Sequence, residues 1–142
     1  MRVAIGCDHG GFDLKGQLVA VLEELGHTVL DQGCYSTASV DYPDFADTVC
    51  AMVEKGESDR GILICGTGIG MSMAANRRPA IRAALCQELF AARMSREHND
   101  ANVLCLGARI VGPGLAAEIV RTWMTTEFAG DRHQQRIAKF SE

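Results

Sequence analysis

The sequence lacks the features that mark membrane, secreted and nucleic-acid-binding proteins. No apolar stretch approaches the roughly 20 residues that a membrane-spanning helix needs, and the apolar N-terminus reaches an acidic loop at Asp8, unlike a signal peptide. Basic residues form no run and are not interleaved with aromatic residues, and the net charge is −4. We therefore expect a cytoplasmic protein that binds neither membranes nor nucleic acid, in which any anionic substrate is held by a local cluster of Arg or His.

The spacing of the cysteines and histidines argues against disulfides and metals. The six cysteines are widely separated, form no Cys-x-x-Cys pair, and mostly lie inside apolar runs. Without an export signal, free thiols in a reducing compartment are the better interpretation. The four histidines fall at no spacing typical of zinc ligands. We expect no metal site and no cofactor.

The chain reads as one domain spanning residues 1–142, because no repeat, low-complexity tract or linker divides it. Patterns typical of strands lie at 2–7, 28–30, 62–65, 81–86 and 102–106. Helical patterns lie at 12–25, 43–55, from the glycine loop to 76, at 88–97 and around 115–123, and the polar tail is expected to be helical. Alternation of the two predicts an α/β fold, a Rossmann-like three-layer sandwich with a five-stranded parallel sheet.

The most informative segment runs from Gly61 to Gly70. An apolar strand ends on Cys65 and passes into a loop with glycine at every second position, at Gly66, Gly68 and Gly70. Glycines let main-chain N–H groups converge on one point, and a following helix adds its positive N-terminal end, so such a loop can hold a phosphate or an oxyanion. The same field favours a thiolate, which makes the cysteine a candidate base or nucleophile. A buried strand-end cysteine beside a tight turn is the structural alternative.

The predicted fold places a second group of polar residues near this loop. In parallel sheets, active sites lie beyond the carboxyl ends of the strands. Asp8 and His9 follow the first strand, while Cys65 and Thr67 follow the third, so we expect an acid, an imidazole, a thiol and a hydroxyl to lie together. Taken alone, Asp8 is explained equally well as a helix cap, and His9 is more typical of a hydrogen-bonded structural histidine. Their shared position at a strand end favours function.

Two charged clusters are weaker candidates for a functional site. Residues 96–100, Arg-Glu-His-Asn-Asp, end a helix just before the fifth strand, which is also typical of a solvated helix end. In the tail, Arg132 and Arg136 are spaced i, i+4, so they share one helical face and could grip a phosphate. Charged tails are more often solvated surface.

Three other classes of protein use similar folds. A dinucleotide-binding protein would use Gly6, Gly10 and Gly11 with Asp31 for a ribose, but this spacing is not Gly-x-Gly-x-x-Gly. A receiver domain would need an aspartate where Cys65 stands. A flavin- or nucleotide-binding module without catalysis stays open as the non-enzymatic alternative.

Six motifs, in order along the chain from Arg2 to Arg136, carry a resemblance to a known family. They are Gly-Cys-Asp-His-Gly-Gly (6–11), Asp-Tyr-Pro-Asp (41–44), Gly-Ile-Leu-Ile-Cys-Gly-Thr-Gly-Ile-Gly (61–70), Ser-Arg-Glu-His-Asn-Asp (95–100), Asn-Val-Leu-Cys-Leu-Gly-Ala-Arg (102–109) and Arg-His-Gln-Gln-Arg (132–136). The sequence resembles the ribose-5-phosphate isomerase B family, which also includes galactose-6-phosphate and allose-6-phosphate isomerases. The resemblance implies a metal-independent aldose–ketose isomerase of the pentose phosphate pathway.

The resemblance also implies roles for individual residues. Cys65 falls on the base that moves a proton between C2 and C1, and Thr67 on the hydroxyl that assists at the cis-enediolate. His98 corresponds to the residue that opens the furanose ring, with Asp8 nearby to handle hydroxyl protons. The anion hole is formed by main-chain amides of the loop, at Gly66, Gly68, Ile69 and Gly70.

The remaining implied contacts concern the substrate. His9, Arg132 and Arg136, together with Arg109, match the family's phosphate ligands. Tyr42 and Asn99 match positions that contact the sugar. The family's active sites lie between two subunits, so a homodimer is implied, and pairing of dimers into tetramers is left open.

One branch of the family replaces the cysteine by a glutamate just after the glycine loop. The corresponding residue here is Met71, which takes no proton, and Cys65 is present, so the sequence is of the cysteine type. The length of the sugar is not readable from the sequence. Ribose 5-phosphate is the first choice, a six-carbon 6-phosphate the second, and tetrose phosphates are substrates of some relatives.

Overall fold

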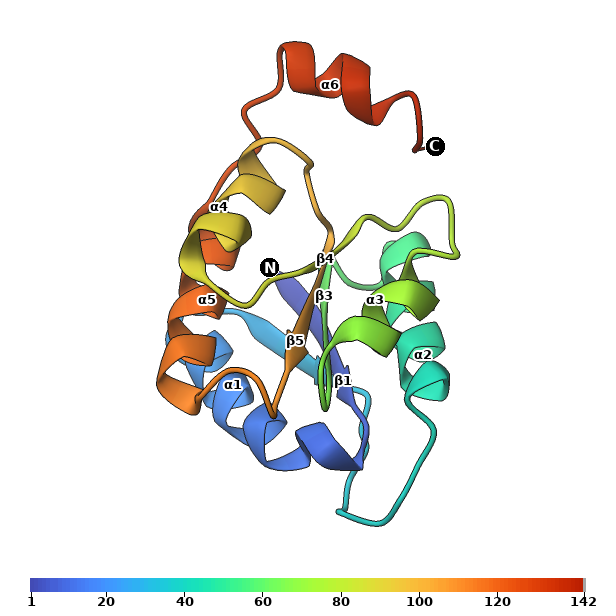
Figure 1. Cartoon of the computed structure of the whole chain (residues 1–142), viewed down its shortest axis with the longest axis vertical. Coiled ribbons are helices and arrows are strands. Elements are labelled where there is room, and N and C mark those ends of the chain that lie inside the picture. Colours follow the sequence, from blue (N-terminus) through green and yellow to red (C-terminus); the bar gives the residue numbers. More distant parts are fainter. Residues whose placement is uncertain (142) are drawn as a thin grey trace.

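Five parallel strands form the central sheet, in the order β2-β1-β3-β5-β4 (Figure 1). The strands are β1 (Arg2–Cys7), β2 (Thr28–Asp31), β3 (Arg60–Cys65), β4 (Ala83–Leu85) and β5 (Val103–Gly107). The structure is a computed structural model that describes residues 1–141. The chain places β2 on one side of β1 and β3 on the other. The order therefore reverses between β1 and β3, and in such sheets ligands bind outside the carboxyl ends of the strands at this point.

Helices cover both faces of the sheet. On one face lie α1 (Phe12–Glu24), α4 (Leu89–Glu97) and α5 (Pro113–Thr125), and on the other α2 (Tyr42–Glu54) and α3 (Ile69–Ala75) (Figure 1). The short helix α6 (Arg132–Ile137) lies off the sheet, beyond the C-terminal end of α4 (Figure 1). The predicted three-layer α/β sandwich with a five-stranded parallel sheet is confirmed.

The core is divided by the sheet into two apolar layers. Side chains alternate along each strand, so in β3 the residues Ile62 and Ile64 face α1, α4 and α5, while Leu63 and Cys65 face α2 and α3. The larger layer includes Trp123 of α5, which is fully buried. Both faces of the central strands are covered, which explains their continuous apolar runs in the sequence.

The fourth strand is shorter than the sequence predicts. The expected range was 81–86, but pairing with β5 begins at Ala83. The side chain of Asn102 accepts a hydrogen bond from the amide of Arg82 at 2.8 Å and donates one to the carbonyl of Ala80 at 2.9 Å. An amide side chain therefore satisfies main-chain groups that a longer strand would have paired.

All six cysteines are free and buried, as expected. Within residues 1–141, none of the helices has the length and apolar character needed to cross a membrane.

Candidate active site

Cys65 ends β3 at the carboxyl edge of the sheet, where the glycine loop begins. Its sulfur accepts a hydrogen bond from the main-chain amide of Gly68 at 3.1 Å. Gly68 has φ +78°, and a Cβ atom there would lie 2.5 Å from Cδ1 of Leu85. Only glycine fits this position, so the turn that aims an N–H group at the sulfur depends on the absence of a side chain.

The loop leads directly into α3, which supplies further main-chain donors. Thr67 Oγ1 accepts a hydrogen bond from the amide of Ile69 at 3.2 Å. The ring of Tyr42 lies against Gly70, where a Cβ atom would be 2.5 Å from the tyrosine Cζ. Tyrosine thus covers the start of the helix because glycine leaves room for it.

A cavity of about 440 Å³ opens beside this loop. Its lining residues are Asp8, Tyr42, Cys65, Gly66, Thr67, Ile69, Gly70 and Met73. The structure therefore brings together the two strand ends that the sequence placed at one edge. A small polyhydroxylated molecule would meet a thiol, a carboxylate, a hydroxyl and main-chain amides here.

Asp8 and His9 follow β1 at the same edge of the sheet. Asp8 Oδ1 accepts a hydrogen bond from the amide of Gly10 at 2.9 Å, so the carboxylate caps the following 3₁₀ turn as well as lining the cavity. The amide of Val40 donates to Nδ1 of His9 at 3.2 Å. A neutral His9 ring therefore carries its proton on Nε2, where it can donate to an anion.

Arg109 lies next to the glycine loop although it is distant in sequence. Its amide donates to the carbonyl of Gly66 at 2.9 Å, and its Cδ would lie 3.6 Å from a Cβ atom on Gly66. The residues on this edge are named the Cys65 half-site: Asp8, His9, Tyr42, Cys65, Gly66, Thr67, Gly68, Ile69, Gly70 and Arg109. It combines a candidate base with donors and cations suited to an anionic substrate.

The other predicted site residues lie at the opposite edge of the sheet. His98 and Asn99 precede β5, whereas Cys65 pairs with Gly107 at its end. Five strand residues separate the two edges, which is roughly 13–16 Å at ~3.3 Å per residue. Helix α6, with Arg132 and Arg136, lies at the same far end (Figure 1). Within one chain, these four residues do not reach Cys65.

The far group, named the His98 half-site, consists of His98, Asn99, Arg132, His133 and Arg136. The rings of His98 and His133 are stacked, with centroids 4.2 Å apart and an angle of 13° between the planes. Burial, and then the proximity of His98, Arg132 and Arg136, lowers the pKa of His133. The stack therefore joins α6 to the end of α4 and disfavours charge on His133.

The sequence interpretation gave no role to His133. The available signal was its spacing from Ile137: the two residues are i, i+4, and both are buried on one face of α6. A histidine on the apolar face of a short polar helix needs a partner inside the protein. That partner is His98.

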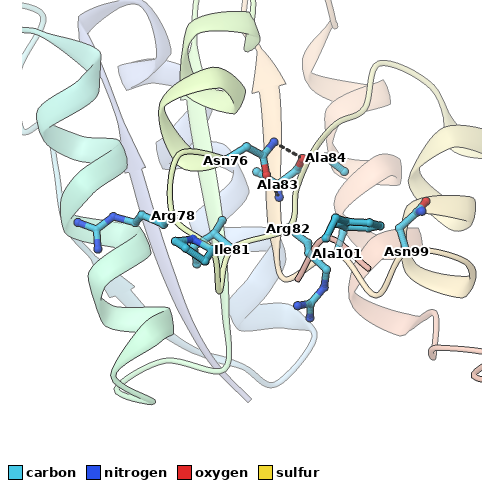
Figure 2. Close-up of a pocket in the computed structure, with 10 residues that line it drawn as sticks. Asn76, Arg78, Ile81, Arg82, Ala83, Ala84, Asn99 and Ala101 are labelled. Atoms are coloured by element: carbon cyan, nitrogen blue, oxygen red, sulfur yellow. Dashed lines mark hydrogen bonds between the residues drawn. The ribbon is translucent and has the colours of Figure 1, made fainter. Parts of the chain in front are cut away.

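Asn99 lines a second cavity, of about 450 Å³, at the far edge (Figure 2). Asn76, Ile81, Arg82 and the exposed ring of Phe140 also line it. Figure 2 shows the Asn99 side chain on one side of this cavity and the Asn76–Ala83 hydrogen bond on the other. The sugar contact expected for Asn99 is therefore not made in the Cys65 cavity of the same chain.

Burial suppresses the ionisation of several other thiols. Burial raises the pKa of Cys50 to about 12, and burial together with the neighbouring Cys34 raises that of Cys7 to about 12. Burial also raises the pKa of Cys105 well above its ordinary value. These thiols stay protonated at neutral pH and are poor bases.

The dinucleotide alternative fits the structure poorly. Asp31, which would bind a ribose, accepts a hydrogen bond from Nζ of the buried Lys15 at 2.7 Å and one from the amide of Gly33 at 2.9 Å. Its carboxylate is therefore committed to holding the loop after β2. For metals, no cluster of three or more His, Cys, Asp or Glu side chains suited to one is found in residues 1–141.

The chain is similar in sequence and in fold to known isomerases. Residues 3–140 match the family described as Ribose/Galactose Isomerase. The chain is 52% identical to the putative sugar phosphate isomerase YwlF of Bacillus subtilis, over 100% of this chain and 96% of the relative. It is 51% identical to ribose-5-phosphate isomerase B of Escherichia coli, over 96% of this chain and 91% of the relative. The structure of Clostridium thermocellum ribose-5-phosphate isomerase B superposes with a TM-score of 0.96 at 54% identity, covering 98% of this chain and 94% of the other. The protein therefore belongs to the ribose/galactose isomerase family and is an aldose–ketose isomerase.

Proposed function

We propose that this isomerase interconverts D-ribose 5-phosphate and D-ribulose 5-phosphate, as a cytoplasmic enzyme of the pentose phosphate pathway. The observation that carries the proposal is the position of Cys65, at a strand end, in a cavity lined by residues of the glycine loop, with the amide of Gly68 donating to its sulfur. The similarity to ribose-5-phosphate isomerases B supports the choice of substrate.

The reaction moves one proton along the sugar chain. Cys65 as thiolate takes the proton from C2 of the open aldose, and the electron pair of that C–H bond forms a cis-enediolate with its negative charge on O1. The O2 hydroxyl proton is transferred to O1, which moves the negative charge to O2. Cys65 then returns its proton to C1 while O2 becomes the carbonyl oxygen. Thr67 assists at the enediolate oxygens, and Asp8 relays the hydroxyl protons. Main-chain N–H groups from Gly66 to Gly70 stabilise the negative oxygen, an effect worth about 3 kcal/mol per donor in favourable cases.

The complete site requires two chains. The His98 half-site lies too far from Cys65 to serve the same sugar within one chain, which supports a homodimer whose sites lie between subunits. In a twofold-symmetric pair each surface meets its counterpart reciprocally, so two equivalent composite sites form. The Cys65 half-site of one chain then faces His98 of the partner subunit. Pairing of such dimers into tetramers is not required by this arrangement.

The phosphate and the ring are handled by groups from both chains. His9 and Arg109 approach the phosphate from the Cys65 half-site, and Arg132 and Arg136 of the partner subunit approach it from the other side. Guanidinium groups suit this role because they donate charge-assisted, often bidentate, hydrogen bonds to phosphate oxygens. Tyr42 and Asn99 of the partner subunit contact the sugar, and His98 of the partner subunit opens the furanose ring.

A six-carbon aldose 6-phosphate, of allose or galactose, is the second candidate. The family description includes galactose as well as ribose, and pentose and hexose phosphates share the same reacting end. The two differ by one hydroxymethylene unit between that end and the phosphate. The distance between the Cys65 half-site and the phosphate ligands therefore decides between them.

The test is a panel of aldose phosphates: ribose 5-phosphate, allose 6-phosphate, galactose 6-phosphate and erythrose 4-phosphate. Ketose formation is measured for each with the purified protein, and kcat/KM values are compared. We expect the highest value for ribose 5-phosphate. A higher value for a hexose 6-phosphate would establish the second candidate, and no ketose from any substrate would contradict both.

A further inference from the structure

Arg96 is a buried arginine one turn before the end of α4. It is 5% exposed, and its guanidinium makes three short contacts. Nη1 donates to Oδ1 of Asp100 at 2.9 Å and to the carbonyl of Ala101 at 2.6 Å, while Nε donates to the carbonyl of Thr126 at 3.2 Å. Two of these contacts therefore span the segment His98–Asn99, because Arg96 precedes it and Asp100 and Ala101 follow it.

Asp100 fixes the far end of that segment. Its backbone has φ +45°, an uncommon conformation for a residue with a side chain. The carbonyl of Asp100 accepts from Nε of Arg82 at 2.9 Å, and its carboxylate forms ion pairs with Arg82 and Arg96. Two arginines therefore hold the strained residue that follows His98–Asn99.

The same guanidinium joins the two parts of the His98 half-site. Thr126, which accepts from Arg96, begins the connection from α5 to α6. Three residues later, the amide of Ala129 donates to the carbonyl of Glu97 at 3.0 Å. The connection to α6 is thus tied to the two residues that precede His98, Arg96 and Glu97, and the His98–His133 stack completes the link.

Burying a guanidinium costs free energy of hydration, which packing contacts alone do not offset. Arg96 lies with its Cζ 5.9 Å from the ring centroid of Trp123, a site that an apolar side chain could fill. Its contacts with Asp100, Ala101 and Thr126 instead define the course of the backbone around His98. We propose that Arg96 is a positioning residue that sets the orientation of His98 and Asn99 for ring opening.

This proposal rests on the proposed function, so its test compares two reactions of one enzyme. Ribose 5-phosphate is almost entirely a closed ring in solution and must be opened. Ribulose 5-phosphate cannot form the same ring, so exchange of its C1 proton with deuterated water needs Cys65 but no ring opening. The ratio of isomerisation of ribose 5-phosphate to this exchange is therefore specific to ring opening, whereas a general loss of folded protein lowers both rates equally.

The variant is Arg96→Lys, which keeps the charge and loses the planar, multiply donating group. We expect its ratio to fall about 10- to 100-fold, because misplacement of a reacting group by about 1 Å costs on this order. Asp100→Gly is the second variant, since glycine adopts the positive φ freely while the carboxylate contacts disappear. Asp100→Gly should also lower the ratio. It tests the proposal independently if Arg96→Lys does not fold.

Arg60 provides a matched control. It is also buried, its Cζ lies 5.2 Å from the Trp123 ring centroid, and its guanidinium donates to the carbonyls of Trp123 and Met124. Arg60→Lys thus perturbs the same tryptophan without removing a bond to residues 97–101, and its ratio should equal that of the unmodified protein.

The outcomes separate this proposal from the one on which it rests. A lowered ratio in Arg96→Lys or Asp100→Gly, with an unchanged ratio in Arg60→Lys, supports positioning by Arg96. Equal losses of both reactions in Arg96→Lys and Asp100→Gly, or a lowered ratio in Arg60→Lys, would overturn it. His98→Asn must itself lower the ratio, and equal losses in that variant would contradict ring opening by His98 and the role of Arg96 together.

Discussion

The main-chain amide of Gly68 donates a hydrogen bond to the sulfur of Cys65 at 3.1 Å. This bond directs a donor at the atom on which a thiolate carries its charge. It depends on a turn at φ +78° that leaves no room for a Cβ atom. The conformation of the glycine loop and the chemistry of the candidate base are therefore linked through one residue.

Replacing Cys65 by alanine should abolish isomerisation while leaving sugar-phosphate binding nearly intact. Loss of a general base costs on the order of 10²–10⁴ in rate, and the thiol makes no contact with the phosphate in the proposed arrangement. A ketose assay measures the rate, and calorimetric titration measures binding. Turnover within about tenfold of the unmodified protein would remove Cys65 from the role of base.

Gly68→Ala should reduce both stability and turnover. The new Cβ atom would lie 2.5 Å from Leu85 Cδ1 and 2.9 Å from the carbonyl carbon of Leu106, so the loop must move and the amide leaves the sulfur. Strained backbone of this kind costs about 1–3 kcal/mol. Denaturant unfolding and the ketose assay measure the two effects.

Gly16→Ala is the matched control for this substitution. Gly16 lies within α1, and nothing would lie within 4 Å of its added Cβ atom. Alanine in a helix interior should stabilise the fold by roughly 0.5–1 kcal/mol, with unchanged activity. If Gly68→Ala behaved in the same way, the loop conformation would not matter to catalysis.

Alkaline pH should destabilise the fold partly through Cys50. Burial raises the pKa of this thiol to about 12, whereas its unfolded pKa is 9.0. The folded state binds the proton more tightly, so this contribution to stability is fully present below pH 9 and is lost as the pH rises toward 12. Between these values the free energy of unfolding should fall by about 1.4 kcal/mol per pH unit for this thiol.

The measurement is denaturant unfolding of the protein and of Cys50→Ala between about pH 8 and pH 10.5. The slope of the unfolding free energy against pH should be shallower in the variant, whatever its stability at pH 8. Identical slopes would show that Cys50 does not contribute.

The sheet and the Cys65 half-site were predictable because both follow from local pattern and topology. Apolar runs fixed the strands to within a few residues, and the carboxyl ends of parallel strands necessarily meet at one edge. The sequence therefore predicts that Asp8 and Cys65 lie together. The shortened β4 was not predictable, because it depends on the side chain of Asn102, which is distant in sequence.

The separation of the two half-sites could partly be predicted from the sequence. Residues before a strand lie at the opposite edge from residues after it, so His98, which precedes β5, could not join Cys65 within one chain. The position of α6 had no such signal, because no strand pattern follows it in the sequence. The stack of His98 on His133 and the burial of Arg96 depend on this packing, and spacing alone does not reveal them.

Arg132→Ala and Arg136→Ala should each raise KM more than they lower kcat. Each substitution removes a charge-assisted hydrogen bond to the phosphate, worth roughly 1.5–3 kcal/mol, or about ten- to a hundredfold in affinity. Steady-state kinetics with ribose 5-phosphate measure both constants, and inhibition by inorganic phosphate should weaken in parallel. Unchanged KM in both variants would make this face of α6 ordinary solvated surface.

Hybrid dimers test whether each site is shared between two chains. Cys65→Ala and His98→Asn subunits, carrying different affinity tags, are co-expressed, and the hybrids are isolated by sequential purification. One site of each hybrid receives both defects and the other receives neither, so the hybrid should recover roughly half of the unmodified activity although each parent is impaired.

Hybrids of Cys65→Ala with Asp8→Asn are the control. Both of these residues lie in the Cys65 half-site, so each site keeps one defect and no recovery is expected. Recovery in neither hybrid, with dimers verified by mass, would place Cys65 and His98 of the same chain in one site and contradict a site shared between two chains.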